Sequence, residues 1–342
     1  MAQAKVTSAQ VAERAGVSQS AVSRVFTPGA SASAKTVEKV RKAATELGYR
    51  PNVLARAMVS GRSRIIGLVV AYLDNQFYPD VLEKLSKALQ SRGYHVLVIM
   101  ASQTAGNVDA VVEEILDYQV DGIIAASVAL SSDLTGRCRA AGVPMVLFNR
   151  SQDVPGVSAV TTHNAEGGRK VAEFLIAGGH RRFGYIAGWE GASTQRDREA
   201  GFVAGLTASG RELNARGVGN FLMDAARDAT LQMFASDPPD AVFVANDHMA
   251  LAVMDTVRSE LGLRVPQDVS IVGYDDVASA AWPAYSLTTV RQPADKMVAE
   301  TVKLLIAKVE DPDTAPQTVQ LDAELIVRGS ARIPEGWTDA GL

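Results

Sequence analysis

The segment VAERAGVSQSAVSRV, residues 11–25, decides the fold of the first part of the chain. Gly16 interrupts an apolar pattern, and glycine commonly ends a helix because it adopts a left-handed backbone easily. Ser18 follows at once, and serine is a favoured residue at a helix N-cap. The segment therefore predicts a helix ending near Ala15, a tight turn, and a second helix running to about Arg24.

The flanking residues extend this pattern to a three-helix unit. Thr7 and Gln10 have the spacing of a capping box, which sets the start of the first helix. A third helix is predicted from Ser33 to Gly48, because apolar residues recur on one face. These residues are Val37, Val40, Ala44 and Leu47. Three short helices that share one apolar face make a minimal core.

The charge distribution sets this unit apart from the rest of the chain. Residues 1–64 hold 11 Lys and Arg against three acids, a net charge of +8, whereas the remainder holds 23 against 35. The outward face of the second helix carries Gln19, Ser20, Ser23 and Arg24, which suit base edges and phosphates. A basic head on an acidic body indicates nucleic-acid binding by the head. A solvated basic face is the alternative interpretation.

From Ile65 onward, short apolar runs alternate with amphipathic segments, which is typical of parallel sheets covered by helices on both faces. Strands are predicted at 65–71, 94–100, 122–126, 145–148, 183–187, 241–245 and 269–273. Helices are predicted at 81–92, 108–118 and 134–141. The pattern restarts after Asn164, so the sequence predicts an α/β fold with two doubly wound lobes.

Polar and aromatic residues follow several of these strands, where ligands of doubly wound sheets bind. They are Asp74, Asn75, Phe77 and Tyr78, then Asn149 and Arg150, residues 189–198, Asn246 with Asp247, and Asp275 with Asp276. Aromatic faces together with Asn, Asp and Arg can pack on a sugar ring and bond its hydroxyls. A single residue of this kind is more often a helix cap or a loop residue, but five strand ends carry them.

Several function classes are not indicated. The chain shows no nucleophile elbow, no phosphate loop and no dinucleotide fingerprint, so we expect neither an enzyme nor a cofactor. Cys138 is the single cysteine and the four histidines are far apart, so no metal site is expected. No apolar run reaches the roughly 18 to 20 residues of a membrane span, and no signal-peptide core is found, so a cytoplasmic, nucleoid-associated protein is expected.

The N-terminal segments VAERAGVS, AVSRV and ELGYRPN resemble the headpiece of the LacI/GalR family of transcriptional regulators. The resemblance implies that the second helix enters the major groove of an operator, and that residues 51–64 hold a hinge helix that folds against its dimer mate on DNA. Met58 would wedge into the minor groove there. The expected DNA-binding residues are Thr7, Ser18, Gln19, Ser20, Ser23, Arg24, Asn52, Ala55, Arg56 and Met58.

The body also resembles this family, at IGLVV, GGHRR, GYDD and LTTV. The resemblance implies an effector cleft lined by Phe77, Tyr78, Asn149, Thr194, Arg198, Phe221, Asn246, Asp275 and Gln292. Arg198 and Asp275 would be its principal hydrogen-bonding residues and Phe221 its stacking wall. Asn149 replaces a frequent aspartate, which favours a neutral or acidic ligand.

These observations predict a pseudo-palindromic operator bound by a homodimer, under the control of a small polar effector. A sugar or sugar acid fits better than a purine. The predicted units are a helix-turn-helix headpiece at 1–50, a hinge at 51–64, an N-terminal lobe of periplasmic-binding-protein type at 65–161 and 293–320, and a C-terminal lobe at 162–292 and 321–342. The alternative is a periplasmic-type binding protein without a regulatory role, which explains the body but not the head.

Overall fold

The computed structural model describes residues 6–27, 30–50, 62–101, 105–128, 131–152 and 156–337. The chain divides into two compact units, Met1–Arg64 and Ile65–Leu342. Four of the predicted DNA-binding residues, Asn52, Ala55, Arg56 and Met58, lie outside the described residues.

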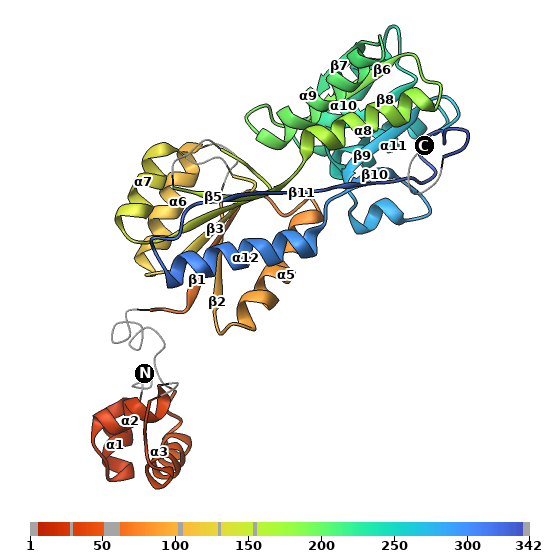
Figure 1. Ribbon diagram of the computed structural model, residues 1–342. Coiled ribbons are helices and arrows are strands. Elements are labelled where there is room, and N and C mark those ends of the chain that lie inside the picture. The colour runs from red at the N-terminus through yellow and green to blue at the C-terminus, as the bar shows by residue number, and fades with distance from the viewer. Residues whose placement is uncertain are drawn as a thin grey trace. The chain divides into compact units, whose positions relative to one another are not determined.

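The first unit contains the three predicted helices, α1 (Ser8–Ala15), α2 (Gln19–Phe26) and α3 (Ala34–Leu47) (Figure 1). Thr7 and Gln10 form the predicted capping box, and Ser18 and Ser33 cap α2 and α3. Gly16 and Gly48 end α1 and α3 with φ of 66° and 67°, so the predicted stop signals are confirmed. The core of this unit is small and is built from side chains that face one another across the three helices: Val11, Ala12, Ala15, Val22, Val40, Ala43 and Ala44.

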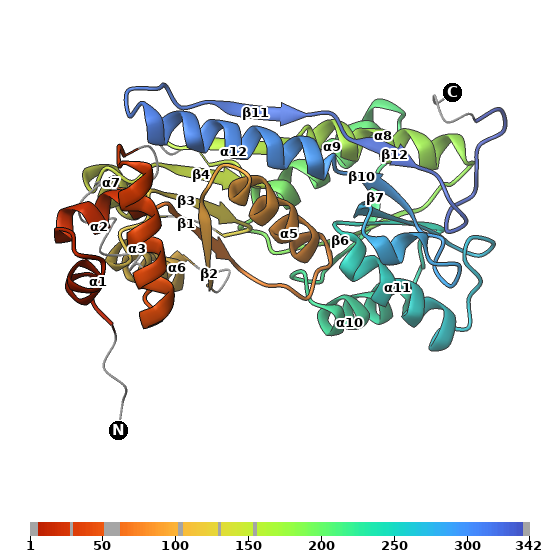
Figure 2. The same cartoon turned by 90° about the horizontal axis from the view of Figure 1, so that it is seen from below.

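The second unit begins with a six-stranded parallel sheet in the order β11-β5-β4-β3-β1-β2. Its strands are β1 (Ile65–Val70), β2 (His95–Met100), β3 (Gly122–Ala126), β4 (Met145–Phe148), β5 (Ser158–Thr162) and β11 (Thr318–Leu321). Its helices are α5 (Phe77–Gln90), α6 (Ala105–Asp117), α7 (Ser132–Ala140) and α12 (Ala294–Glu310). Helices α5 and α12 lie side by side on one face, and α6 and α7 cover the other (Figures 1 and 2).

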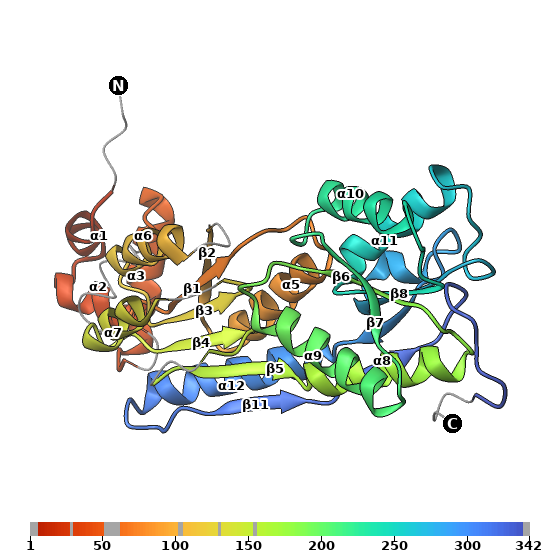
Figure 3. The same ribbon diagram turned by 90° about the horizontal axis from the view of Figure 1, so that it is seen from above.

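The second sheet has the order β12-β10-β9-β8-β6-β7, and only its β10–β12 pair is antiparallel. Its strands are β6 (Phe183–Ala187), β7 (Leu213–Val218), β8 (Ala241–Val244), β9 (Ser270–Asp275), β10 (Thr288–Arg291) and β12 (Glu324–Ile326). Helices α8 (Asn164–Ala177) and α9 (Ser193–Ala208) cover one face, and α10 (Met223–Phe234) and α11 (Asp247–Ser259) cover the other (Figure 3). A short 3-10 helix, η1 (Ala278–Ala281), follows β9. The two predicted doubly wound lobes are confirmed.

The chain passes between the two sheets three times: from β5 to α8, from β10 to α12, and from β11 to β12. Each passage is only a few residues long. Short parallel connections of this kind allow two lobes to close on a ligand by a hinge motion. The two lobes are therefore joined by three short connections at which a motion of this kind can occur.

Candidate functional site

The exposed face of α2 carries the predicted base-reading residues. Gln19, Ser20, Ser23 and Arg24 are all exposed. Gln19 Nε2 donates a hydrogen bond to Ser8 Oγ at 2.8 Å, and Arg24 Nε donates to the Ser20 carbonyl at 3.4 Å. These contacts orient long side chains that are otherwise free to meet a ligand. The other two predicted residues, Thr7 and Ser18, are exposed as well, but their hydroxyl oxygens serve as helix caps.

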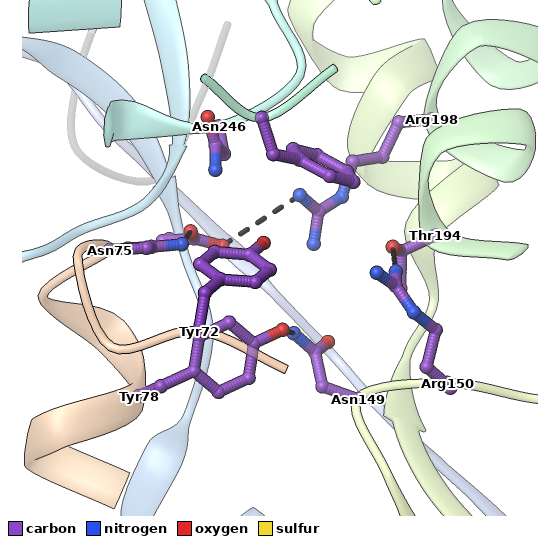
Figure 4. Close-up of a pocket in the computed structure, with 10 residues that line it drawn as sticks. Tyr72, Asn75, Tyr78, Asn149, Arg150, Thr194, Arg198 and Asn246 are labelled. Atoms are coloured by element: carbon purple, nitrogen blue, oxygen red, sulfur yellow. Dashed lines mark hydrogen bonds and ion pairs between the residues drawn. The ribbon is translucent and has the colours of Figure 1, made fainter. Parts of the chain in front are cut away.

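A pocket lies between the two lobes of the second unit, at the carboxyl ends of the parallel strands (Figure 4). The first lobe contributes residues that follow β1 and β4 and one residue of α5. The second lobe contributes residues of α9, residues that follow β7 and β8, and the last residue of β9. The lining consists of Tyr72, Asn75, Tyr78, Asn149, Arg150, Thr194, Arg198, Phe221, Asn246 and Asp275. Seven of the nine predicted effector residues are among these ten.

Arg198 and Asp275 form the buried polar centre of the pocket, 3.7 Å apart between Nη1 and Oδ1. Arg198 Nε donates to Asn164 Oδ1 at 2.8 Å, Nη1 donates to the Ala245 carbonyl at 2.6 Å, and the guanidinium stacks 3.6 Å from the ring centroid of Tyr274. Burial raises the pKa of Asp275, and the positive charge of Arg198 opposes that rise. Fixed partners on three sides hold this pair in one geometry.

The two lobes are also bonded to each other through Asp275. Asn75 of the first lobe donates from Nδ2 to Asp275 Oδ2 at 3.2 Å, and Gln292 donates from Nε2 to Asp275 Oδ1 at 2.7 Å. A ligand that binds Asp275 must share or displace these donors. The carboxylate is therefore placed where ligand binding can change the contact between the lobes.

Residues at three strand ends of the pocket have left-handed backbones. Asn149 has φ of 55°, Phe221 of 62° and Asp275 of 122°. Such conformations cost about 1 to 3 kcal/mol each and cluster at functional sites, where the surrounding structure enforces them. They turn these three side chains toward the space between the lobes, which supports a binding role for the pocket.

The aromatic wall consists of Phe221 and Tyr72, whose rings are stacked at 6.4 Å with an interplanar angle of 22°. Gly188 makes room for Phe221, because a Cβ at this glycine would lie 2.1 Å from the Phe221 ring. An apolar ring face next to hydrogen-bonding groups is the combination that packs on and orients a sugar ring.

Three polar atoms of the lining have no hydrogen-bond partner among the described residues: Asn149 Oδ1, Arg150 Nε and Arg198 Nη2. Buried polar groups are almost always satisfied in folded proteins, so unsatisfied ones at a pocket indicate groups that await a ligand. One acceptor and two charged donors define the hydrogen-bonding pattern that a ligand would complete.

Two predicted effector residues do not line this pocket. Phe77 begins α5 and packs in the core, 5.4 Å from Tyr78 and 6.3 Å from Phe148 between ring centroids. Gln292 is buried behind Asp275 and acts on it by a hydrogen bond. Aromatic packing therefore keeps Phe77 in the core, and hydrogen bonds with Asp275 and Thr162 hold Gln292 away from the lining.

Three lining residues were absent from the predicted effector set. The sequence marks Asn75 and Arg150 as polar residues that follow strands, but it does not single out Tyr72. A signal exists for Tyr72 and Arg150, because both come directly after a buried parallel strand, whereas Asn75 lies farther along the loop. Tyr72 comes two residues after β1, and Arg150 two residues after β4.

Asp247 lies behind the pocket as a fully buried acid at the start of α11. Thr289 Oγ1 donates to its Oδ1 at 2.6 Å and the Val277 amide donates to its Oδ2 at 3.0 Å. Burial, together with the nearby charge of Asp275, raises the pKa of Asp247 to about 7. Between about pH 4 and pH 7, the folded protein therefore holds a proton at this carboxyl that the unfolded chain has lost.

We expect the Asp247→Asn substitution to reduce the pH dependence of stability. Because the pKa of Asp247 is raised in the folded state, this carboxyl lowers the free energy of unfolding of the wild type as the pH rises from about 4 to about 7. Above about pH 7 its contribution is constant. The variant lacks this titrating carboxyl. Its free energy of unfolding, relative to that of the wild type, should therefore increase as the pH rises from about 4 to about 7. Urea unfolding at pH 4.5 to 8 measures this, and a difference that does not vary with pH would contradict the raised pKa.

Within the described ranges, no group of three His, Cys, Asp or Glu side chains is placed to hold a metal ion. Across the same residues, no helix has the length and apolar character needed to cross a membrane.

Known proteins are similar to this chain over almost its whole length. Residues 9–52 match the model described as bacterial regulatory proteins, lacI family, and residues 172–331 match the periplasmic binding protein-like domain. The HTH-type transcriptional regulator CelR of Thermobifida fusca is 34% identical over 330 residues, which cover 94% of this chain and 96% of CelR.

Solved structures show the same similarity. A lac repressor dimer bound to operator and the anti-inducer ONPF is 30% identical with a TM-score of 0.85, covering 95% of this chain and 99% of that one. A complex of the transcriptional regulator CelR with cellobiose is 32% identical with a TM-score of 0.72, and the match covers 96% of this chain and 100% of that chain.

Proposed function

Because the chain belongs to the lacI family of bacterial regulatory proteins, we propose a function in which its headpiece binds operator DNA and its cleft binds the ligand that controls this binding. The chain is a sequence-specific DNA-binding transcriptional regulator. One observation carries the proposal: an exposed polar face on a basic headpiece and a strained, partly unsatisfied pocket belong to the same chain.

The effector is a sugar or a sugar acid. One similar structure is a complex with cellobiose, and another holds the lac repressor with its anti-inducer. The pocket supports the same class, since Phe221 and Tyr72 offer an apolar face beside Asn246, Arg198 and Asp275. Tyr78, Asn149 and Thr194 complete the proposed binding set. A purine is the second candidate for the same aromatic wall.

Ligand binding controls the headpiece by moving the lobes. A ligand that replaces the Asn75–Asp275 contact changes the relation of the two lobes at their three short connections. In a dimer, this motion shifts the first lobes against each other and changes the spacing of the headpieces through residues 51–64. Operator affinity then changes because both half-sites must be occupied at once.

Operator binding is the test of this function. Selection of the full-length protein against randomised inverted-repeat duplexes should enrich one sequence, and its affinity should fall steeply with salt. The binding of the enriched duplex should then change on addition of one ligand from a panel of sugars, sugar acids and purines. Equal binding to every duplex would contradict the function.

Arg24→Ala should weaken binding to the selected operator by about 1 to 3 kcal/mol and relax its sequence preference, because Arg24 is exposed on the reading face of α2. Fluorescence anisotropy with cognate and scrambled duplexes measures both effects. Arg41→Ala, an exposed change on α3, is the control and should lower affinity for the two duplexes alike. Unchanged discrimination in the Arg24 variant would contradict the readout role.

The regulator acts as a homodimer. Among the described residues, strand β2 pairs only with β1 and forms an edge of the first sheet, where Val98 and Met100 are 39% and 46% exposed. Leu222, Met223 and Trp282 of the second lobe are also large apolar side chains in contact with solvent. Exposed apolar groups on an unpaired strand edge are unusual in a monomer and fit a surface covered by a second copy.

Val98→Lys should therefore produce a monomer that has lost most of its operator affinity, because a charged residue on a strand edge opposes pairing. Analytical ultracentrifugation measures the mass, and anisotropy measures DNA binding. Ala208→Lys adds the same charge at an exposed position of α9 and should stay dimeric. A dimeric Val98 variant would place the interface elsewhere.

We propose that the protein catalyses no reaction. We also propose that it acts in the cytoplasm, where its operator DNA lies. Its relatives are transcriptional regulators. The ligand should be recovered chemically unchanged after prolonged incubation, which chromatography checks.

A further inference from the structure

The charges that line the pocket do not balance. Arg150, Arg198 and Asp275 are its three formally charged residues, so two cations share one carboxylate. Asp275 forms its ion pair with Arg198. Arg150 is 4% exposed, and its hydrogen-bond partners and ring contact in the described chain are all uncharged.

The Arg150 guanidinium is surrounded by uncharged groups that satisfy only part of its hydrogen-bonding capacity. Nη1 donates to Thr194 Oγ1, Nη2 donates to Ser127 Oγ at 3.0 Å, and the guanidinium lies 5.6 Å from the centroid of the Phe221 ring. Nε has no partner among the described residues. None of these partners of the Arg150 guanidinium in the described part of the chain is a carboxylate, and hydroxyls and a ring compensate only part of the hydration that a buried guanidinium loses.

We propose that the effector carries one oxyanion, a carboxylate or a phosphate, and that Arg150 recognises it. The inference rests on the proposed function, because it names the ligand class of the same pocket. The planar guanidinium binds carboxylate and phosphate oxygens with strong, charge-assisted hydrogen bonds, and the Nε of Arg150, which has no partner among the described residues, is a donor for one of these oxygens. The anion supplies the negative charge that the lining lacks.

The rest of the lining suits the remaining part of such a ligand. Figure 4 shows Arg150 and Arg198 on one side of the pocket, across from Tyr72, Asn75 and Tyr78. Asn149 Oδ1 and Arg198 Nη2 are free to bond ring hydroxyls. The acceptor and the donor on these two side chains match the hydroxyls of a sugar ring, and Arg150 matches one anionic substituent on that ring.

Matched ligand sets test the charge requirement in the full-length protein. Each set contains a hexose, its uronate and its 6-phosphate, for glucose and for galactose, and acetate and inorganic phosphate serve as minimal oxyanion probes. Thermal unfolding is measured against sodium chloride of equal ionic strength. We expect anionic ligands to raise the midpoint and neutral hexoses to leave it unchanged, because only a bound ligand stabilises the fold. The uronate and phosphate arms distinguish the two kinds of oxyanion.

Arg150→Gln removes the charge and keeps donors for Thr194 or Ser127. By calorimetry, affinity for the best anion should fall about 10-fold to 100-fold, the range expected for a hydrogen bond to a charged group. Arg150→Lys should recover part of it. Arg216→Gln, which removes a charge paired with Glu199 and Glu190 outside the pocket, should bind the anion as the wild type does.

A purely structural role for Arg150 predicts a different pattern. The unliganded Arg150→Gln protein would then have a lower unfolding midpoint, whereas removal of an unpaired buried charge should leave the midpoint equal or raise it. The inference is overturned if neither sugar anions nor the small oxyanions stabilise the wild type, if a neutral hexose binds as tightly as its uronate and phosphate, or if Arg150→Gln keeps full affinity for the anion.

Failure of this inference is distinguishable from failure of the regulator function. If the protein selects one operator and a neutral sugar controls its binding, only the charge requirement is wrong. If no inverted repeat is preferred, the regulator function itself fails, whatever Arg150 binds.

Discussion

Arg198→Met is expected to abolish the response to the effector while the protein still binds its operator. Arg198 is 2% exposed and holds the centre of the pocket through Asn164, the Ala245 carbonyl and Asp275. Its free Nη2 is a charged donor for the ligand. Loss of hydrogen bonds to a charged group should weaken ligand binding by at least about 100-fold. Calorimetry measures this, and anisotropy measures operator affinity with and without ligand.

The control for this prediction removes the carboxylate charge of Asp275, which the loss of Arg198 would leave unpaired. Removal of Arg198 leaves Asp275 buried without its cation, which is destabilising in its own right. The double variant Arg198→Met with Asp275→Asn removes both charges, so it should fold well and still fail to respond. Arg196→Met, an exposed change on the same helix, should respond normally. Full ligand affinity in the Arg198 variant would place the binding site elsewhere.

Gly201→Val is expected to lower the free energy of unfolding by about 3 kcal/mol or more, at the upper end of the cost of overpacking. A Cβ at Gly201 would lie 1.8 Å from the Ala165 carbonyl oxygen, and a Cβ at Gly168 would lie 2.1 Å from the Arg198 carbonyl oxygen. Helices α8 and α9 therefore touch backbone to backbone, and a side chain at this contact must push them apart. Urea unfolding measures the loss.

The same substitution should impair ligand binding, because the crossing of α8 and α9 also sets the position of Arg198. Ala204→Val, at an exposed position of α9, is the matched control, since it adds the same β-branched side chain where space is free. Its cost should stay near the difference in helix propensity, below about 1 kcal/mol. If both variants unfold at the same urea concentration, the close approach of the helices does not exist.

The boundaries of α5 show where local patterns fail. The apolar pattern predicts a helix from Val81, whereas α5 begins at Phe77. Asn75 Oδ1 accepts the Phe77 amide at 3.1 Å and starts the first turn before the amphipathic pattern becomes visible. This early start carries Phe77 into the core. The expectation that Phe77 lines the cleft comes from the family resemblance, whereas in this structure its ring packs against Tyr78 and Phe148.

Edge strands are also difficult to predict from a local apolar pattern. Strand β7 alternates between exposed and half-buried residues and contains Asn214 and Arg216, so no apolar run marks it. The central strands β3, β4 and β6 are buried at every position, and the sequence predicts their bounds as the structure has them. A strand covered on both faces is usually apolar, whereas an edge strand need not be. Strand β5 is the exception: it is buried at every position, but its serine and threonine residues break the apolar run, so the pattern does not predict it.

The sequence by itself determined the helix caps of the first unit, the strands that are apolar throughout and the polar residues that follow them, because these features depend on neighbours within a few residues. Only the tertiary structure decided which of those polar residues share a pocket. Asn75 and Asp275 are 200 residues apart and bond at 3.2 Å, and Arg150 meets Thr194 across the two lobes. Contacts of this kind arise from the packing of two separate sheets, so no local pattern carries them, and the charge imbalance that singles out Arg150 becomes visible only once both lobes are in place.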